Sequence, residues 1–219
     1  YLADQVRELA TGWEPRLRLG LESTTEREPL FQALGALLTE QANLEIDVQE
    51  CVLSGGWEAL EMDSIDLLVG APSPVPQQKG FRTLPIAPAE MQLVAAANHP
   101  ISRLAANPQA IAEQLPNCRR IVSHDTAKFN VLRNEGLTIG KQVLYVQTME
   151  QKIQAQLAGL GVGHLPRKLI QAHLESGALV VLSTGEPTTE NLQRYLAWKI
   201  SNKGKALNRL TQLLGKVSW

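Results

Sequence analysis

The chain has 219 residues, of which 44% are hydrophobic and 20% charged, and its formal net charge at pH 7 is −1. This length allows one large domain or two smaller lobes with their own cores. The balanced charge lacks the basic excess of a nucleic-acid-binding domain, and the sequence contains no apolar run of transmembrane length and no signal peptide. Cys51 and Cys118 do not suggest a disulfide framework, so we expect buried thiols in a reducing cytoplasm.

The first residues have the pattern of the end of a helix. Leu2, Val6 and Leu9 are helically spaced, and Gly12 suits a C-cap. Because the chain starts at Tyr1 rather than at a methionine, we interpret it as a fragment of a longer protein.

The next segment predicts a β-α-β-α-β run. Alternating leucines at 17, 19 and 21 predict a strand, and Pro29 opens a helix with an apolar stripe to Leu38. Residues 46–48 and 65–70 predict two further strands, with a turn at 54–56 and a helix over 57–62 between them. Such a run predicts a parallel sheet with right-handed crossovers.

The middle and the end of the chain continue with strands and helices. Prolines between Ala71 and Gly80 mark a linker. Strands are predicted at 83–86, 91–96, 120–123, 143–147 and 195–200, and helices at 111–115, 129–135 and 205–214.

Residues 148–183 predict helix, strand, helix and strand in that order. Thr148 suits an N-cap, with Gln151 at the capping-box spacing. Glycines at 159 and 161 end the first helix, Pro166 starts the second, and residues 179–182 predict a buried strand.

A family resemblance emerges from these motifs. The run AGLGVGHLP at 158–166, followed by LESGALV at 174–180, resembles the signature of the effector-binding domain of LysR-type transcriptional regulators. Residues 29–38, 65–70 and 90–101 resemble further segments of that family in the same order. Asp63 and Ser64 depart from it, since the family often has a glycine there, and we expect a changed turn without a change of fold.

The resemblance implies an α/β fold of two Rossmann-like lobes joined by two crossover strands, similar to periplasmic binding proteins. Residues 1–12 would end a linker helix, 13–82 and 184–219 would form lobe I, and 83–183 would form lobe II. The crossovers would lie near 81–84 and 179–183, and the family's DNA-binding helix-turn-helix domain is absent from this chain.

The candidate ligand-binding residues lie in polar loops at the carboxyl edge of the predicted sheets. In parallel α/β sheets, ligands bind beyond the carboxyl ends of strands, where helix N-termini favour anions. Polar loops of this kind carry Ser23, Thr24, Thr25, Ser54, Gly55, Ser123, His124, Asp125 and Thr148. The resemblance implies that these loops line an effector cleft between the lobes.

Each of these residues also has a purely structural interpretation. Ser54 and Thr148 are expected to cap helices, which is compatible with touching a ligand. Thr24 and Thr25 fit simple loop positions. His164 replaces a residue that is usually apolar in the signature, and it is either a pocket residue or a histidine satisfied within the fold.

No catalytic or metal site is expected. Ser123, His124 and Asp125 are adjacent in sequence and cannot converge as a triad. Cys118 with His124 and Asp125 lacks a zinc spacing, and neither a P-loop nor a nucleophile elbow occurs. We therefore expect no enzyme activity, no metal and no cofactor.

The sequence thus favours a cytoplasmic, effector-sensing domain of a bacterial LysR-type regulator. We expect a small-molecule effector, and the polar loops suggest a carboxylate or another anion. We also expect a homodimer or homotetramer with the helix 29–41 at the subunit interface. DNA would be bound only through the missing N-terminal domain, and no membrane partner is expected. The alternatives are a free-standing solute-binding protein of the same bilobed fold and, with less support, a bilobed enzyme.

Overall fold

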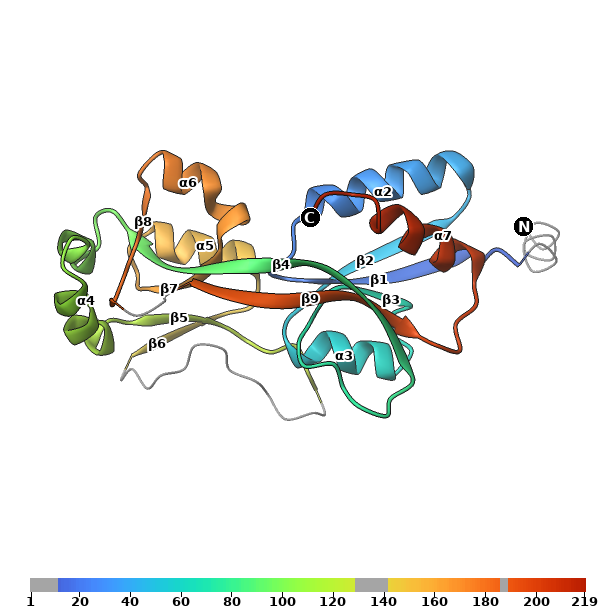
Figure 1. The fold of residues 1–219 in the computed structure, drawn as a ribbon, viewed down its shortest axis with the longest axis horizontal. Helices are drawn as coiled ribbons and strands as arrows, with labels where there is room; N and C mark the ends of the chain where they lie inside the picture. Colours follow the sequence, from blue (N-terminus) through green and yellow to red (C-terminus); the bar gives the residue numbers. More distant parts are fainter. Residues whose placement is uncertain (1–11, 129–141, 186–188) are drawn as a thin grey trace. The chain divides into compact units, whose positions relative to one another are not determined.

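The computed structural model describes residues 12–128, 142–185 and 189–219, which form two compact units (Figure 1). Within this range, unit 1 comprises residues 12–87, 126–128 and 193–219, and unit 2 comprises residues 88–125, 142–185 and 189–192. The predicted helices at the N-terminus and at 129–135 lie outside the described residues. None of the described helices has the length and apolar character needed to cross a membrane.

Unit 1 is built on the parallel sheet that the sequence predicts. Strand β1 (Arg16–Glu22) pairs in parallel with β2 (Glu45–Cys51) and β3 (Leu67–Pro72), and β9 (Thr189–Lys199) runs antiparallel to β3. The sheet order is therefore β2-β1-β3-β9, with β4 next to β9. The helices of this unit are α2 (Arg27–Glu40), α3 (Ser54–Glu61) and α7 (Lys205–Leu214).

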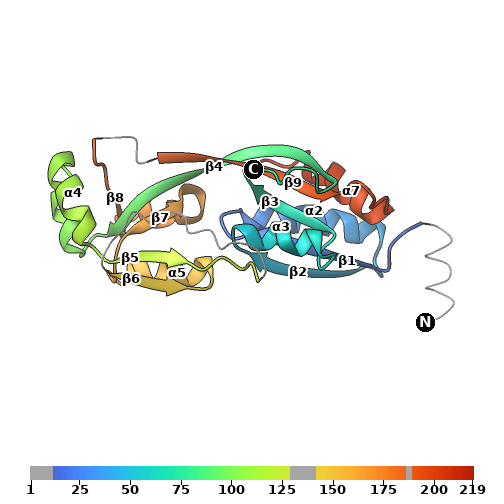
Figure 2. The ribbon, with the colours of Figure 1, turned by 90° about the horizontal axis from the view of Figure 1, so that it is seen from below.

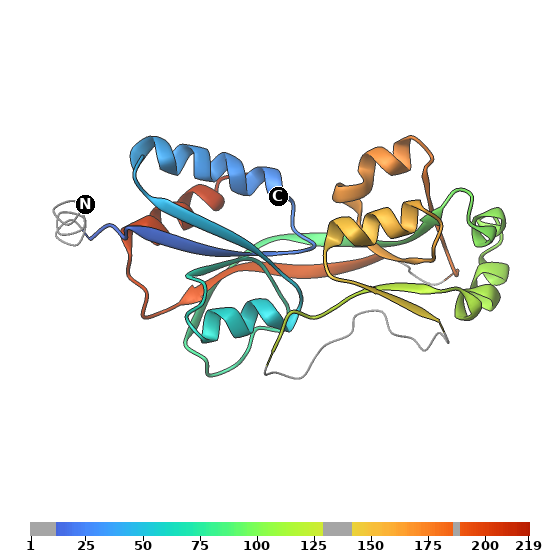
Figure 3. The same cartoon turned by 180° about the vertical axis from the view of Figure 1, so that it is seen from behind.

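Helices cover both faces of the unit 1 sheet. Helices α2 and α7 lie on one face and α3 on the other, as Figures 1 and 3 show from opposite sides. Successive strand residues point to opposite faces, so Leu67 packs with α2 and α7, whereas Leu68 packs against Trp57 of α3. The predicted apolar stripe of the helix after Pro29 is confirmed for Leu30, Leu34 and Leu37, which are buried, but not for Phe31 and Leu38, which are exposed.

Helix α3 begins earlier than predicted. Ser54, Gly55 and Gly56 form its first turn, although the sequence predicted a turn before the helix. Leu53 supplies the sharp change of direction instead, with a left-handed φ of 55°. The glycines serve close packing, because a Cβ on Gly56 would lie 2.7 Å from a methyl group of Leu68.

Unit 2 contains a mixed set of strands. Strand β4 (Phe81–Ala96) pairs antiparallel with β7 (Gly163–Pro166) and with β8 (Leu179–Val181). Strand β5 (Arg120–Ser123) pairs in parallel with β6 (Val143–Val146), and a parallel bridge joins Arg120 to Val162 at the start of β7 (Figure 2).

Short helices complete unit 2. One side is formed by α5 (Met149–Leu157), the 3-10 helix η3 (Arg167–Ile170) and α6 (Gln171–Glu175), and the other by η1 (Pro100–Leu104), α4 (Pro108–Gln114) and η2 (Leu115–Asn117). Val94 of β4 packs with Met149 and Ile153 of α5, whereas its neighbours Leu93 and Ala95 pack with Ile101 and Ile111. Each face of β4 therefore has its own apolar core.

The chain passes between the units in β4 and β9. These unit boundaries fall after Ala87 and after Leu192, and a further boundary falls after Asp125. The segment expected to form the second crossover, near 179–183, instead contains β8, which pairs with β4 inside unit 2 through Ala95 and Val180. The strands predicted separately at 83–86 and 91–96 form one continuous strand, β4, which includes Pro85 and Pro88.

Candidate functional site

The loop after β1 places hydroxyl groups at the carboxyl edge of the unit 1 sheet. The Ser23 N–H donates to the Cys51 carbonyl at the end of β2 (2.9 Å), and the Thr25 N–H donates to the Glu22 carbonyl (2.8 Å). Thr25 is fully buried, and its Oγ1 has no hydrogen-bond partner among the described residues. A buried hydroxyl without a partner costs free energy, so Thr25 Oγ1 is a candidate contact for a ligand.

The approach of Thr25 to the sheet depends on a glycine of β3. Gly70 has a φ of +80°, and a Cβ at this position would lie 1.8 Å from Thr25 Oγ1. Only a glycine leaves room for the threonine side chain in this place. No pattern in the sequence predicts this contact.

A buried carboxylate shares this edge with the hydroxyls. Glu22 is 2% exposed, and its Oε1 accepts from the Ser23 hydroxyl (3.2 Å) and from the Leu53 N–H (3.4 Å). Burial, with Glu22 and Glu50 nearby, also raises the pKa of the Cys51 thiol to about 12, so that Cys51 stays protonated. The unit 1 edge is therefore better suited to a neutral polar group of a ligand than to an anion.

The second loop of unit 1 brings Ser54 and Gly55 to the start of α3. Ser54 was expected to cap this helix, but Leu53 occupies the N-cap position and no side chain accepts a capping bond. The segment 126–128 lies against the same turn: Thr126 Oγ1 accepts from the Val52 N–H (2.9 Å), and the Lys128 N–H donates to Glu58 Oε1 (2.7 Å). A cavity of about 460 Å³ lined by Gly55, Thr126 and residues of β2 and α3 adjoins it.

Unit 2 brings a second pair of polar loops together. Ser123 at the end of β5 is in register with Val146 at the end of β6, and Thr148 follows directly as the N-cap of α5. The predicted cap is confirmed, because Thr148 Oγ1 accepts from the Gln151 N–H (3.1 Å), and Gln151 Oε1 accepts from the Gln147 N–H (2.9 Å). Ser123 Oγ is buried and has no hydrogen-bond partner in the described parts of the chain.

The remaining predicted residues of unit 2 lie near this edge. The His124 N–H donates to the Val146 carbonyl (2.9 Å), and the His124 ring stacks on Tyr145 with centroids 4.7 Å apart. Asp125 and the half-buried His164 both interact with other groups of the chain. His164 lies in β7 opposite Leu93 of β4, and its role in ligand binding stays a prediction.

Each unit thus gathers predicted residues at the carboxyl ends of its parallel strands: Ser23, Thr24, Thr25, Ser54 and Gly55 in unit 1, and Ser123, His124, Asp125 and Thr148 in unit 2. His164 lies instead within β7, which pairs antiparallel with β4. No group of three or more possible metal ligands occurs among the residues described. Both cysteines are free, with Cys51 buried and Cys118 partly exposed.

The sequence and the fold of this chain match one family over almost their whole length. Residues 10–218 match the family described as the LysR substrate binding domain. The chain belongs to the LysR family. This confirms the resemblance found in the sequence motifs and supports a regulator rather than a free-standing solute-binding protein.

Two LysR-type relatives from Escherichia coli K12 extend beyond the matched region. The uncharacterized HTH-type transcriptional regulator YeeY is 29% identical over 186 residues, which cover 82% of this chain and 57% of YeeY. The probable HTH-type transcriptional regulator YhaJ is 29% identical over 206 residues, which cover 94% of this chain and 67% of YhaJ. The chain therefore spans little more than half of the length of YeeY.

Solved LysR domains share the fold. The effector binding domain of QuiR in complex with shikimate superimposes with a TM-score of 0.63 at 16% identity, covering 91% of this chain and 94% of that chain. The BenM effector binding domain with its effector benzoate gives a TM-score of 0.58 at 14% identity, covering 93% and 92%. At these identities the likeness is one of fold, and it confirms the predicted α/β architecture similar to periplasmic binding proteins.

One buried residue of this LysR domain was missed by the sequence analysis. The Arg194 side chain is 2% exposed; its Nε donates to the Ala87 carbonyl (2.9 Å) and its Nη1 to Glu26 Oε2 (2.7 Å). It therefore ties β9, β4 and the residue after Thr25 together. No pattern in the sequence marks it, because an arginine between Gln193 and Tyr195 resembles an exposed strand residue.

Proposed function

We propose that this chain is the effector-sensing domain of a LysR-type transcriptional regulator, and that its effector is a small carboxylate bearing further polar groups. The observation that carries the proposal is a pair of buried hydroxyls, Thr25 Oγ1 and Ser123 Oγ, that have no hydrogen-bond partner among the described residues. Each follows the carboxyl end of a parallel strand. Ligands of open α/β sheets bind at such ends. The effectors bound by QuiR and BenM, shikimate and benzoate, are carboxylates and support the same chemical class.

Each unit presents a different kind of polar group at the carboxyl ends of its strands. The unit 2 loops combine Ser123 Oγ with the N-terminus of α5, whose positive dipole end favours a carboxylate. The unit 1 loop has the buried Glu22 carboxylate beside Thr25, which disfavours an anion and favours a hydroxyl. We therefore propose that the carboxylate binds to the unit 2 loops, and that the Thr25 edge of unit 1 suits a neutral polar group.

In the complete protein, the effector would shift an equilibrium between two arrangements of the regulator. A ligand can do so only by binding one arrangement more tightly than the other.

Promoter DNA would be bound outside this chain, as the names of the relatives suggest, and a cytoplasmic location follows from that role. We propose a homo-oligomer, supported by Phe31 and Leu38, which lie two helical turns apart on α2 and are 55% and 37% exposed.

A thermal-shift screen of this chain tests the effector proposal. The panel contains shikimate, benzoate, aromatic and aliphatic hydroxy acids, and the corresponding amides. A carboxylate present at a hundred times its dissociation constant should stabilise the fold by about 2.7 kcal/mol. Ser123→Ala should abolish that shift, and Thr25→Val should abolish any shift caused by a ligand of the unit 1 loop. Both variants should leave the unliganded melting temperature unchanged or higher, because each removes a buried hydroxyl that has no hydrogen-bond partner among the described residues.

Thr211→Val is the matched control. Thr211 is buried in α7, and its Oγ1 donates to the Asn208 carbonyl (2.8 Å), so this variant should lose stability but keep the ligand-induced shift. The proposal is wrong if amides stabilise the chain as well as acids do. It is also wrong if the shift survives in both Ser123→Ala and Thr25→Val.

A further inference from the structure

Unit 2 contains a cavity at the opposite ends of the strands from Ser123 and Thr148. The cavity has a volume of about 530 Å³ and is lined by residues that precede β5, β6 and β7 and by the η1 segment that follows β4. Ser123 and Thr148 lie where β5 and β6 end, so the length of these strands separates the cavity from the proposed effector loops. Pockets for small molecules occupy about 300–1,000 Å³, so the cavity has a suitable size for one.

The charged groups that line this cavity are cationic among the described residues. Arg103 and Arg119 line it, and no aspartate or glutamate of the described part of the chain does. Within the described part of the chain, neither guanidinium forms an ion pair. Two arginines without a carboxylate partner favour an anion as ligand.

His99 adds a directed hydrogen-bond donor. Its Nδ1 accepts from the Ile101 N–H at 3.3 Å, so the proton of the neutral ring resides on Nε2. Burial lowers the pKa of His99, which keeps the ring neutral at pH 7. The N–H at Nε2 has no hydrogen-bond partner among the described residues and is available to a ligand.

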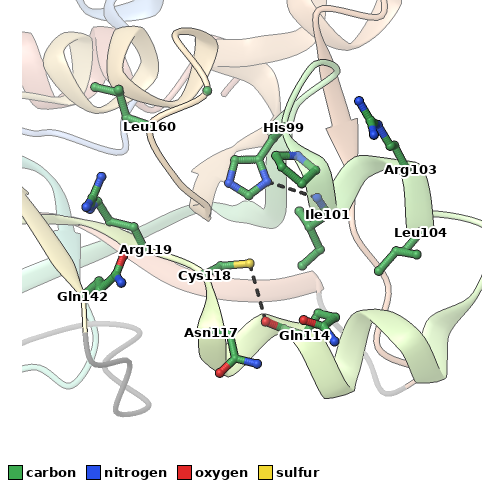
Figure 4. Close-up of a pocket in the computed structure, with 12 residues that line it drawn as sticks. His99, Ile101, Arg103, Leu104, Gln114, Asn117, Cys118, Arg119, Gln142 and Leu160 are labelled. Atoms are coloured by element: carbon green, nitrogen blue, oxygen red, sulfur yellow. Dashed lines mark hydrogen bonds between the residues drawn. The ribbon is translucent and has the colours of Figure 1, made fainter.

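Apolar side chains provide the rest of the lining. Figure 4 shows His99 and Cys118 in the middle of the cavity lining, with Arg119 and Leu160 on one side and Arg103 and Leu104 on the other. Leu160 is 46% exposed, so part of its side chain is accessible to a ligand. These groups present an apolar surface directly beside the cationic ones.

We propose that this cavity is a second small-molecule site, which binds an organic anion with an apolar ring or branched chain. Arg119 and the Nε2–H of His99 bind the anionic group, and Leu104 and Leu160 contact the apolar body. The site is independent of the proposed effector loops, so a ligand here occupies the domain without displacing the effector.

Cys118 provides a readout that is specific for this site. It lines the cavity and is partly exposed, whereas Cys51 is buried. Burial raises the pKa of both thiols, and that of Cys51 to about 12. Iodoacetamide should therefore modify Cys118 selectively, and mass spectrometry of the cysteine-containing peptides measures its rate at increasing concentrations of benzoate. Benzoate should slow the alkylation of Cys118 with saturation, and neutral benzamide should do so much more weakly.

Matched variants separate this site from general charge effects. Arg119→Gln should raise the half-protecting benzoate concentration about tenfold through loss of a charge-assisted hydrogen bond. Arg82→Gln removes the same charge from an exposed residue of β4 in unit 1 and should have no effect. Ser123→Ala and Thr25→Val should leave the protection of Cys118 unchanged.

Four results would overturn the proposal. The first is saturable protection by benzamide equal to that by benzoate. The second is equal loss of protection in Arg119→Gln and Arg82→Gln, and the third is loss of protection in Ser123→Ala or Thr25→Val. Absence of any protection by benzoate up to concentrations that saturate the effector loops would also count against it. The effector proposal is unaffected by these outcomes, since its own test uses melting temperatures and the hydroxyl variants.

Discussion

At the scale of single residues, the buried polar side chains distinguish this domain from a plain apolar core. Arg194 is the largest of the fully buried side chains, and its partners, Ala87 and Glu26, come from parts of the chain distant in sequence. Glu26 directly follows Thr25 and precedes α2. The arginine therefore fixes the backbone that presents the Thr25 hydroxyl.

Removing this guanidinium should be costly. Arg194→Met takes the cation away from Glu26, whose side chain is only 14% exposed, and breaking such a buried pair costs about 3–5 kcal/mol. Adding Glu26→Gln to Arg194→Met should restore part of the lost free energy of unfolding. Urea denaturation of the wild type, the two single variants and the double variant should therefore give a favourable coupling free energy between the two residues. Additive effects of the two substitutions would show that the pair does not stabilise the fold.

His99 should make the stability of the domain depend on pH. Its folded-state pKa is lowered by burial, whereas in the unfolded chain it has its ordinary value near 6.5. As the pH falls through that value, the unfolded chain binds the proton first, so the free energy of unfolding decreases below about pH 6.5.

His99→Asn tests this titration. Asparagine keeps an acceptor for the Ile101 N–H but does not titrate, so the difference in stability between pH 7.5 and pH 5.5 should become smaller. Urea denaturation at the two pH values measures it. An unchanged difference would mean that His99 does not contribute to the pH dependence.

At the scale of the elements, glycines with different surroundings have different roles. Gly55 in the first turn of α3 lies against the segment 126–128, and a Cβ there would lie 1.9 Å from Thr126 Oγ1. Gly35 in the middle of α2 is exposed and has no atom within 4 Å of such a Cβ. The first glycine is required by packing, and the second is not.

Alanine substitutions should therefore have opposite effects at these two positions. Gly55→Ala forces Thr126 away from the start of α3 and should cost about 1–3 kcal/mol. Gly35→Ala should stabilise the chain by about 0.5–1 kcal/mol, because alanine is the better helix former. Melting temperatures that move in the same direction for both variants would contradict this explanation of α3.

The sequence could predict the elements that leave a local pattern, either an apolar face with the period of a helix or strand or a capping motif. Pro29 with the stripe of α2, the alternating leucines of β1, and the capping pair Thr148 and Gln151 are local patterns, and the structure confirms them. The start of α3 could not be predicted, because a serine followed by two glycines is typical of a turn and the reason for the glycines is tertiary packing. The continuity of β4 could not be predicted either, because Pro88 lies between the two predicted strands, at 83–86 and 91–96, and proline is unfavourable in the interior of a sheet.

At the scale of the whole molecule, the order of the elements determines where ligand-binding loops can lie. Parallel pairing of β1 with β2 and of β5 with β6 brings the loops after these strands to one edge within each unit. The sequence could predict this edge and the hydroxyl groups on it. It could not predict which hydroxyls would be buried without partners, nor that Glu22 would share the edge with Thr25, because both depend on side-chain packing.

The central claim is that a small carboxylate binds the loops after β5 and β6 of unit 2. Hydrogen–deuterium exchange of this chain, with and without the most stabilising carboxylate of the thermal-shift screen, tests it directly. We expect slower amide exchange at residues 147–151 when the ligand is bound, in the wild type but not in Ser123→Ala. Protection confined to residues 99–104 and 117–119 would place the ligand in the cavity lined by Arg119 and would contradict the assignment of the effector site.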